Sequence, residues 1–161
     1  MVIILNNIRS LYNVGSIFRT ADAAGVEKIY LCGITPEPVD RFGKLRAQLV
    51  KVSLGAEKSV KWEKVKTASR LIDKLREEGY KIFSVEQAKS SIPYNKLKVQ
   101  SKKLKSFALV FGNEVKGLPP AILKRSDKIL EIPMRGKKES LNVGVAFGVV
   151  IFYLTNESGR N

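Results

Sequence analysis

The sequence predicts an α/β fold in which a mostly parallel sheet carries helices on both faces. Short apolar runs alternate along the chain with longer segments whose apolar residues recur at helical spacing. Glycine or proline punctuates this alternation, and the chain contains no internal repeat and no low-complexity block. Strands that alternate with helices form parallel sheets, because each crossover returns the chain to the same edge. At 161 residues the chain is long enough for one domain with a substantial core.

The first predicted elements are a strand, a helix and a second strand. Residues 2–5 form an apolar run that predicts a strand, and residues 28–32 form another that stops before Gly33. Between them, the spacing of apolar residues predicts a helix that Asn13 caps and Gly25 ends. Its buried face is expected to carry Val14, Ile17, Phe18, Ala21 and Ala24.

The same alternation continues to the end of the chain. The apolar run at residues 107–111 leads directly into Gly112, and Pro119 is a favourable residue at the start of a short helix. Ser140 is expected to cap a long apolar helix that ends near Thr155. Together these patterns predict strands at 80–85, 107–111 and 128–132 and helices at 67–78, 119–125 and 140–155.

The net charge and the counts of histidine and cysteine limit the kinds of partner and catalytic site that this chain can have. The 29 Lys and Arg residues against 15 Asp and Glu give a formal net charge of +14, which favours a polyanionic partner. The basic residues concentrate in residues 41–66, with eight basic and two acidic side chains, and in residues 94–106, with five lysines and no acid. For any single lysine, a solvated surface is the simpler explanation. The chain has no histidine, which excludes histidine-based triads and histidine-ligated metal sites. It has one cysteine, Cys32, which excludes disulfides within the chain and multi-cysteine clusters.

No targeting segment or membrane span is predicted. The N-terminal apolar run is too short for a signal peptide and lacks a basic leader. The most apolar stretch, residues 143–154, is shorter than the ~20 residues that cross a bilayer. We therefore expect a soluble, cytoplasmic protein with no membrane partner, in which Cys32 is a small buried hydrophobe.

Two common phosphate-binding motifs are absent. Residues 112–117 have the paired glycines of a phosphate loop, but Leu118 and Pro119 follow where Lys and Ser or Thr are required. No Gly-x-Gly-x-x-Gly follows the first strand, so an ordinary dinucleotide-binding turn is excluded as well. A ligand of this chain must therefore be held in another way.

Three other segments place polar residues at the ends of predicted elements. Asn13 lies at the start of a predicted helix, and Arg19 lies six residues later, off its apolar face. An amide and a guanidinium near a helix N-terminus suit an anion such as a phosphate; the simpler interpretation is a capping asparagine and a surface arginine. Glu114 lies in a glycine-containing loop that follows a predicted strand. Its carboxylate is either a structural hydrogen-bond acceptor or a functional group of a ligand site. Ser140 is the expected cap of the last helix, whereas Asn142, inside the expected first turn, is less ordinary because asparagine is a modest helix former.

These segments resemble the SpoU (TrmH-like) branch of the SPOUT superfamily, whose members are S-adenosylmethionine-dependent RNA 2′-O-ribose methyltransferases. The matching strings are NVGSIFRTA at 13–21, FGNEVKG at 111–117, IPM at 132–134 and SLNV at 140–143, with LGAE at 54–57 as a further likeness. The likeness extends over nearly the whole chain, and the motifs stand in the family's order.

The resemblance implies a fold whose C-terminal part is threaded into a deep trefoil knot. General topology rules oppose knots, so this expectation rests on the resemblance alone. It also implies that the knot loops hold the methyl donor S-adenosylmethionine, released as S-adenosylhomocysteine, through backbone groups and apolar side chains and without a metal. By position, the donor contacts are Gly112, Ile132, Met134 and Leu141.

The implied reaction is methyl transfer from a sulfonium to a ribose 2′-oxygen of tRNA or rRNA. The matching catalytic positions are Asn13, Arg19, Glu114, Ser140 and Asn142. Arginine is hardly ever deprotonated in proteins, so we expect Arg19 to grip an RNA phosphate and stabilise the developing alkoxide rather than act as a base. Ser140 and Asn142 are expected to orient the ribose or relay its proton, and Glu114 to order the loop.

The resemblance also implies a homodimer, and the apolar character of residues 143–154 is consistent with an interface helix. Residues 1–161 are expected to form a single methyltransferase catalytic domain without a separate RNA-binding extension, so that the domain itself grips RNA through mainly electrostatic contacts. The expected contacts are Arg9, Arg41, Arg46, Lys51, Lys102, Lys103 and Lys105. Gly144 departs from the family pattern, in which a second small polar residue follows Asn-Val.

Two alternatives use the same fold: a knotted methyltransferase that acts on a base, and a non-catalytic RNA-binding or assembly factor. The pairs Asn13 with Arg19 and Ser140 with Asn142 favour ribose over base. A pure binder has no need to keep Glu114 together with Ser140 and Asn142, which favours an enzyme.

Overall fold

The computed structural model describes residues 1–97 and 106–157 of the chain. In these residues seven strands form one sheet in the order β3-β2-β1-β6-β4-β7-β5, and every neighbouring pair is parallel. The prediction of an α/β protein with a mostly parallel sheet is confirmed. The strands are β1 (Val2–Asn6), β2 (Lys28–Cys32), β3 (Lys61–Val65), β4 (Lys81–Val85), β5 (Ile92–Pro93), β6 (Phe107–Phe111) and β7 (Lys128–Glu131).

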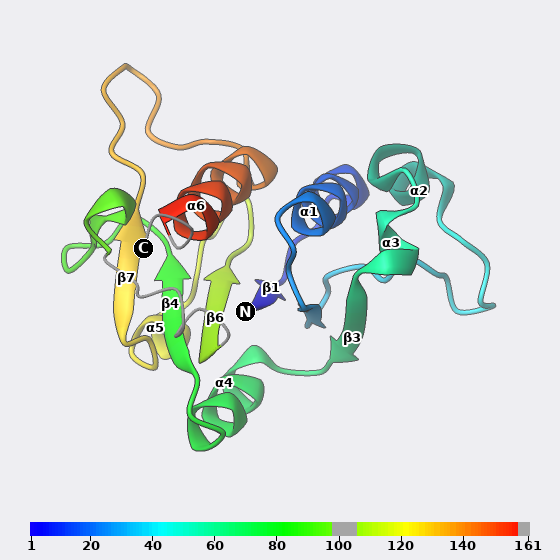
Figure 1. The fold of residues 1–161 in the computed structure, drawn as a ribbon, viewed down its shortest axis with the longest axis horizontal. Helices are drawn as coiled ribbons and strands as arrows, with labels where there is room; N and C mark the ends of the chain where they lie inside the picture. The colour runs from blue at the N-terminus through cyan, green and yellow to red at the C-terminus, as the bar shows by residue number, and fades with distance from the viewer. Residues whose placement is uncertain (98–105, 158–161) are drawn as a thin grey trace.

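Helices connect the strands and cover both faces of the sheet (Figure 1). Buried residues of α1, α2, α3 and α6 pack on one face, and those of α4 and α5 pack on the other. The helices are α1 (Leu11–Ala23), α2 (Ala47–Ser53), α3 (Ala56–Ser59), α4 (Ala68–Glu77), α5 (Pro120–Leu123) and α6 (Val143–Glu157), with one 3₁₀ turn, η1 (Tyr94–Lys96). No helix in the described part of the chain combines the length and the apolar character that a membrane span requires.

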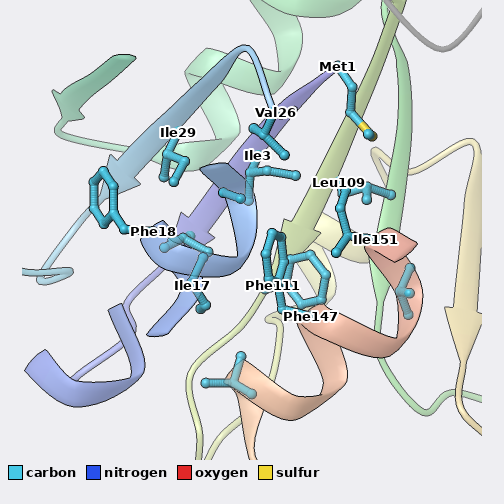
Figure 2. Close-up of a cluster of buried hydrophobic side chains, with 14 of the residues drawn as sticks. Met1, Ile3, Ile17, Phe18, Val26, Ile29, Leu109, Phe111, Phe147 and Ile151 are labelled. Carbon is cyan, nitrogen blue, oxygen red and sulfur yellow. The ribbon is translucent and has the colours of Figure 1, made fainter. Parts of the chain in front are cut away.

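The central strands are apolar throughout because both of their faces are covered. Successive side chains of a strand point to opposite faces, so Ile3 and Leu5 pack with α1 and α6, whereas Val2 and Ile4 pack with α4. Figure 2 shows the cluster on the first face, where the ring of Phe147 in α6 meets the last residue of β6. The two ring centroids are 5.3 Å apart and the rings meet edge to face.

The register of the sheet places the carboxyl ends of four strands, β1, β6, β4 and β7, at the same edge. Leu5 of β1 pairs with Phe111 of β6, Phe111 pairs with Val85 of β4, and Val85 pairs with Leu130 of β7. The segments that follow these strands therefore leave the sheet side by side, at the carboxyl edge where open parallel sheets bind their ligands.

The start of α1 differs from the prediction. Ser10, not Asn13, caps this helix: the Ser10 hydroxyl oxygen accepts a hydrogen bond from the backbone N–H of Asn13 at 3.2 Å. Asn13 lies inside the first turn, which leaves its side chain available for other contacts. The predicted end is confirmed, since Ala24 is the C-cap and Gly25 follows with a left-handed φ of 69°.

The start of α6 also differs, because the helix begins at Val143. The Asn142 side-chain oxygen accepts hydrogen bonds from the backbone N–H groups of Gly144 at 2.9 Å and Val145 at 3.4 Å. Asn142 is therefore the capping residue, and the prediction that Ser140 caps the helix is wrong because the helix begins three residues after it.

The basic stretch at 41–66 contains α2, α3 and β3, which the sequence patterns do not predict. β3 is an edge strand in which Lys61, Glu63 and Lys64 are exposed, so no apolar run marks it. Cys32, at the end of the neighbouring β2, is buried as expected, and burial raises the pKa of its thiol to about 12.

Candidate active site

A cavity of about 490 Å³ opens at the carboxyl edge of β4, β6 and β7. Its wall comes from the residues that follow these three strands, from the first turn of α1 and from the start of α6. A volume of this size is typical of small-molecule sites. The wall includes four expected catalytic positions, Asn13, Glu114, Ser140 and Asn142, and all four expected donor positions, Gly112, Ile132, Met134 and Leu141.

Glu114 binds the chain that leads into α1. One of its carboxylate oxygens accepts hydrogen bonds from the backbone N–H of Ser10 at 3.1 Å and from the Asn13 side-chain amide at 3.0 Å. The other accepts from the backbone N–H of Arg9 at 3.0 Å. A carboxylate beside a helix N-terminus is also stabilised by the helix dipole. Glu114 therefore joins the loop after β6 to the start of α1.

The same contacts set the protonation state of Glu114. Partial burial raises the pKa of this carboxyl, but hydrogen bonds from the Arg9 backbone, the Asn13 side chain and the Ser10 backbone lower it, and the net pKa lies below its ordinary value. Glu114 is thus ionised at neutral pH and serves only as an acceptor.

Asn13 and Asn142 extend the hydrogen bonds of Glu114 into a row of three side chains along the cavity wall. The Asn142 side-chain Nδ2 donates a hydrogen bond to Asn13 Oδ1 at 3.0 Å, and Asn13 Nδ2 in turn donates to Glu114. We call Glu114, Asn13 and Asn142 the amide row. It connects the segments around Asn13, Glu114 and Asn142 that carry the family resemblance, although the first lies more than a hundred positions from the other two.

The packing of the loop after β6 depends on two glycines. A Cβ atom at Gly112 would lie 2.7 Å from the backbone carbon of Gly117 and 2.8 Å from the backbone nitrogen of Leu118. Gly117 has a left-handed φ of 65°, and a Cβ there would collide with the carboxylate of Glu86. Both glycines are therefore required for the loop to fold back on itself, and both also line the cavity.

Several residues of the cavity wall were missed by sequence reasoning, among them the polar residues Glu86, Gln87 and Asn113. Glu86 and Gln87 directly follow β4, and Asn113 lies two residues after β6. Glu86 accepts a hydrogen bond from the backbone N–H of Leu118 at 2.8 Å, and Gln87 donates to the backbone oxygen of Glu139 at 2.5 Å. Their position after buried strands, at the ligand-binding edge of a parallel sheet, is the one signal that points to them.

The charge of the cavity differs from that of the protein. Its wall includes the carboxylates Glu86, Glu114 and Glu131, while no Lys or Arg is among the described residues that line it. The remaining wall is largely apolar, with Phe111 and Leu130 at the ends of their strands. An acidic, partly apolar cavity in a chain of net charge +14 favours a small cationic ligand with an apolar body.

Arg19 is not brought into this cavity. It is exposed on α1, and it is not among the residues that line the wall. Arg9 and Lys116 instead line a second cavity of about 600 Å³, which shares Asn113, Val115 and Gly117 with the first.

The other expected RNA contacts lie farther along the chain. Arg41 and Arg46 belong to the segment between β2 and α2, and Lys51 is exposed on α2. Lys102, Lys103 and Lys105 fall outside the described residues.

The profile of the SpoU rRNA Methylase family matches residues 1–152. Among curated proteins, the 23S rRNA (guanosine-2′-O-)-methyltransferase RlmB of Escherichia coli (strain K12) is 34% identical to this chain over 151 residues. The match covers 94% of this chain and 58% of the relative, so the chain spans less than two thirds of the length of that relative.

Solved structures show the same likeness. A TrmH/SpoU tRNA modifying enzyme of A. aeolicus superposes with a TM-score of 0.82 at 28% identity, covering 98% of this chain and 75% of that chain. An AdoMet-bound rRNA methyltransferase from Sinorhizobium meliloti superposes with a TM-score of 0.84 at 28% identity, covering 96% of this chain and 55% of that chain. Because the family profile spans all of the segments that form the cavity wall, this chain belongs to the SpoU rRNA Methylase family.

Proposed function

We propose that this chain transfers a methyl group from S-adenosylmethionine to a ribose 2′-hydroxyl of tRNA or rRNA in the cytoplasm. The observation that carries the proposal is the amide row on the wall of a cavity whose only charged lining residues, in the described part of the chain, are carboxylates. Family membership supports it, and so do the names of relatives that act on tRNA or rRNA.

The cavity suits S-adenosylmethionine in charge as well as in size. This donor carries a positively charged sulfur and an ammonium group, which the carboxylates of Glu86, Glu114 and Glu131 favour. A nucleoside triphosphate is disfavoured by the same carboxylates, consistent with the absence of a phosphate loop. The residues present therefore fit the donor that the family uses.

Backbone edges and apolar side chains would hold the donor. We assign this role to Gly112, Ile132, Met134 and Leu141, which all line the cavity. Phe111 and Leu130 add apolar surface for the adenine ring. When bound, the donor supplies an electrophilic methyl group. Everything else in the reaction concerns how the chain positions the acceptor ribose and where the hydroxyl proton goes.

Most hydrogen-bonding groups of the two amides in the row are already used within the protein. Asn142 Oδ1 accepts from α6, and one N–H of its amide is donated to Asn13. Asn13 donates one N–H to Glu114 and accepts with its oxygen. Each side chain retains one N–H, which we assign to the oxygens of the acceptor ribose. Such fixed donors orient the ribose, and orientation supplies much of the rate in a transfer of this kind.

Ser140 is the side chain we assign to the 2′-hydroxyl proton. Its hydroxyl is exposed on the cavity wall and has no hydrogen-bond partner in the part of the chain that the structure describes. Its oxygen is therefore free to accept a hydrogen bond from the ribose 2′-hydroxyl while its own hydrogen is donated to solvent or to an RNA phosphate, so that the proton can be relayed in one concerted step. Glu114 is unsuited to this role, since it is a weak base that already accepts hydrogen bonds from three residues.

Arg19 is assigned to an RNA phosphate. It lies outside the cavity of its own chain, so a grip on the RNA backbone suits it better than contact with the donor. Arg9, Arg41, Arg46 and Lys51 are assigned the same kind of contact, which places RNA along the surface outside the cavity.

We further propose that two copies of the chain pair through α1 and α6. Support comes from the family resemblance and from large apolar side chains that are exposed on these two helices. Tyr12 is 52% exposed, Val145 is 52% exposed and Phe152 is 41% exposed. An exposed patch of this kind favours an interface between proteins.

We also propose that the C-terminal part of the chain forms the trefoil knot of the family. Family membership supports this proposal. So does the strand order, since β6 lies between β1 and β4, and β7 lies between β4 and β5, so that late strands are inserted beside earlier ones.

The proposal is tested by incubating the chain with labelled S-adenosylmethionine and transcripts of tRNA and rRNA that carry no modification. We expect label in RNA with the wild-type chain, and far less with Ser140→Ala. Tight binding of the donor without transfer to any RNA would instead favour a non-catalytic RNA-binding factor.

A further inference from the structure

The chain between β2 and α2 folds into a short hairpin, residues 38–46. The backbone N–H of Arg46 donates to the Pro38 carbonyl at 2.9 Å, and the N–H of Asp40 donates to the Lys44 carbonyl at 2.8 Å. Between them, Val39 and Leu45 form an antiparallel bridge. In Figure 1 the chain just before α2 extends outward from the sheet on the right of the view.

The tip of this hairpin is fixed by Asp40. One oxygen of its carboxylate accepts hydrogen bonds from the backbone N–H groups of Phe42 at 2.8 Å and Lys44 at 3.0 Å. Gly43 supplies the left-handed φ of 76° that the turn requires. A tip that is ordered before binding loses little entropy when a partner docks on it.

Phe42 is presented at this tip with 79% of its surface exposed. The guanidinium carbon of Arg41 lies 4.7 Å from the centre of the Phe42 ring, in cation–π geometry. The guanidinium covers one side of the ring, and the large exposed fraction leaves the ring accessible to a second planar group.

The surroundings of Phe42 are basic. Arg41, Lys44 and Arg46 flank it in sequence, while the one acidic neighbour, Asp40, directs its carboxylate oxygen to backbone N–H groups. An aromatic side chain among Arg and Lys is the arrangement that binds unpaired nucleotides, with the ring under a base and the cations near phosphates. The core of a protein interface is instead depleted of charge, which makes a protein partner the less favoured occupant.

The hairpin leaves the sheet at the same edge as the active-site cavity. Cys32, the last residue of β2, pairs with Asn6, the last residue of β1, so the hairpin leaves from the same carboxyl edge as the segments that line the active-site cavity. Ile34, in the segment between β2 and the hairpin, lines the second cavity together with Arg9 and Lys116. An RNA strand along this edge can therefore meet both cavities and the hairpin.

We propose that the tip of the hairpin is a stacking platform for an unpaired base of the RNA substrate, with Phe42 under the base and Arg41 and Arg46 near its phosphates. The proposal rests on the proposed function, because it takes RNA as the substrate. It implies that the chain recognises a single-stranded loop or a splayed-out nucleotide rather than an uninterrupted duplex.

The test is fluorescence anisotropy with a labelled oligoadenylate of about twelve nucleotides, within the site size of single-strand binders. We expect Phe42→Ala and Phe42→Leu to weaken binding about 5- to 100-fold and Phe42→Trp to retain it. Leu54→Ala, which truncates another exposed apolar side chain outside the hairpin, is the matched control and should bind as the wild-type chain does.

Two further readouts separate stacking from charge. The salt dependence of binding should be unchanged in Phe42→Ala, whereas Arg41→Gln and Arg46→Gln should each reduce its slope by about 0.7. A chain of abasic sugar-phosphate units should bind equally well to the wild-type chain and to Phe42→Ala, since it offers no base to stack.

The outcomes that overturn the platform are distinct from those that overturn the proposed function. Equal oligoadenylate affinity of the wild-type chain and Phe42→Ala, or no binding by the wild-type chain, would overturn the platform. A change of oligomeric state in Phe42→Ala, with RNA affinity unchanged, would assign Phe42 to a protein contact. Failure of the wild-type chain to transfer methyl groups, with the Phe42 effect on affinity intact, would overturn the methyl-transfer function and support the platform.

Discussion

The side chain of Asn142 donates a hydrogen bond of 3.0 Å to the side-chain oxygen of Asn13, across 129 positions of sequence. The other hydrogen-bond partners of the two asparagines decide which of them donates. Glu114 is an ionised acceptor, so Asn13 must give it an N–H and turn its oxygen toward Asn142. The N–H groups of α6 require an oxygen, so Asn142 must give its own oxygen to the helix and its N–H to Asn13. Only a side chain with both a donor and an acceptor satisfies either position.

Asn142→Asp is expected to separate the two roles of this residue. Aspartate caps helices as well as asparagine does, but it has no N–H for Asn13. We expect methyl transfer to fall by up to about 100-fold, because the ribose donors lose their fixed orientation. The free energy of unfolding, measured with urea, should drop by about 1 kcal/mol or more in Asn142→Ala, which also removes the cap, and by less in Asn142→Asp. Full activity of Asn142→Asp would show that the amide row is not needed for transfer.

Glu114 is expected to make stability depend on pH in the acidic range. Its folded pKa lies below the ordinary value of 4.5, so its contribution is fully present above that value and is lost as pH falls through the lowered folded pKa. The difference in unfolding free energy between the wild-type chain and Glu114→Gln should therefore be largest at neutral pH and should shrink in acid. Urea unfolding at several pH values measures it. A difference that stays constant from neutral pH to well below pH 4 would show that the carboxylate charge plays no part.

Gly112→Ala is expected to disturb the loop that forms the cavity wall. The added methyl group would lie within 2.8 Å of backbone atoms of Gly117 and Leu118, which cannot move independently of the loop. We expect a loss of about 1–3 kcal/mol in unfolding free energy and weaker donor binding by calorimetry. Gly136→Ala is the matched control, because a Cβ there meets no atom within 4 Å, and its stability should stay within about 0.5 kcal/mol of wild type. Equal stability of the two variants would contradict the close packing at Gly112.

Arg19→Ala is expected to reduce methyl transfer while donor affinity stays unchanged. Arg19 does not line the cavity, so its loss should leave the calorimetric donor affinity of the chain intact. Loss of a phosphate grip and of its positive charge should lower single-turnover transfer about 100- to 1000-fold, as removal of an electrostatic stabiliser does in other enzymes. Arg70→Ala removes an exposed arginine of α4, on the opposite face of the sheet, and should leave both quantities unchanged. A large fall in donor affinity in Arg19→Ala would place Arg19 in the donor site instead.

The central strands could be predicted from sequence because burial on both faces makes them uniformly apolar. The bounds of β6, in which all five residues are buried, match the prediction for that reason. β3 could not be predicted, since an edge strand is stabilised by its pairing with β2 and exposes Lys61, Glu63 and Lys64.

The caps show why local sequence is insufficient at the site itself. Ser10 and Asn13 are both competent caps, as are Ser140 and Asn142, and the local sequence does not choose between them. In the folded chain Asn13 is required by Glu114 and Asn142, which lie about a hundred positions away. Glu86 illustrates the same limit, because its partner Leu118 lies on a different loop of the sheet edge. The family motifs indicated most of the cavity wall, and these tertiary contacts show how its residues are held.

The atom of the RNA that receives the methyl group distinguishes a ribose methyltransferase from a base methyltransferase. RNA labelled by the wild-type chain is digested completely with alkali, which cleaves only at nucleotides that have a free 2′-hydroxyl. We predict that the label appears in alkali-resistant dinucleotides, because the 2′-oxygen carries the methyl group. Label found only in mononucleotides would show that a base is methylated and would contradict the ribose assignment.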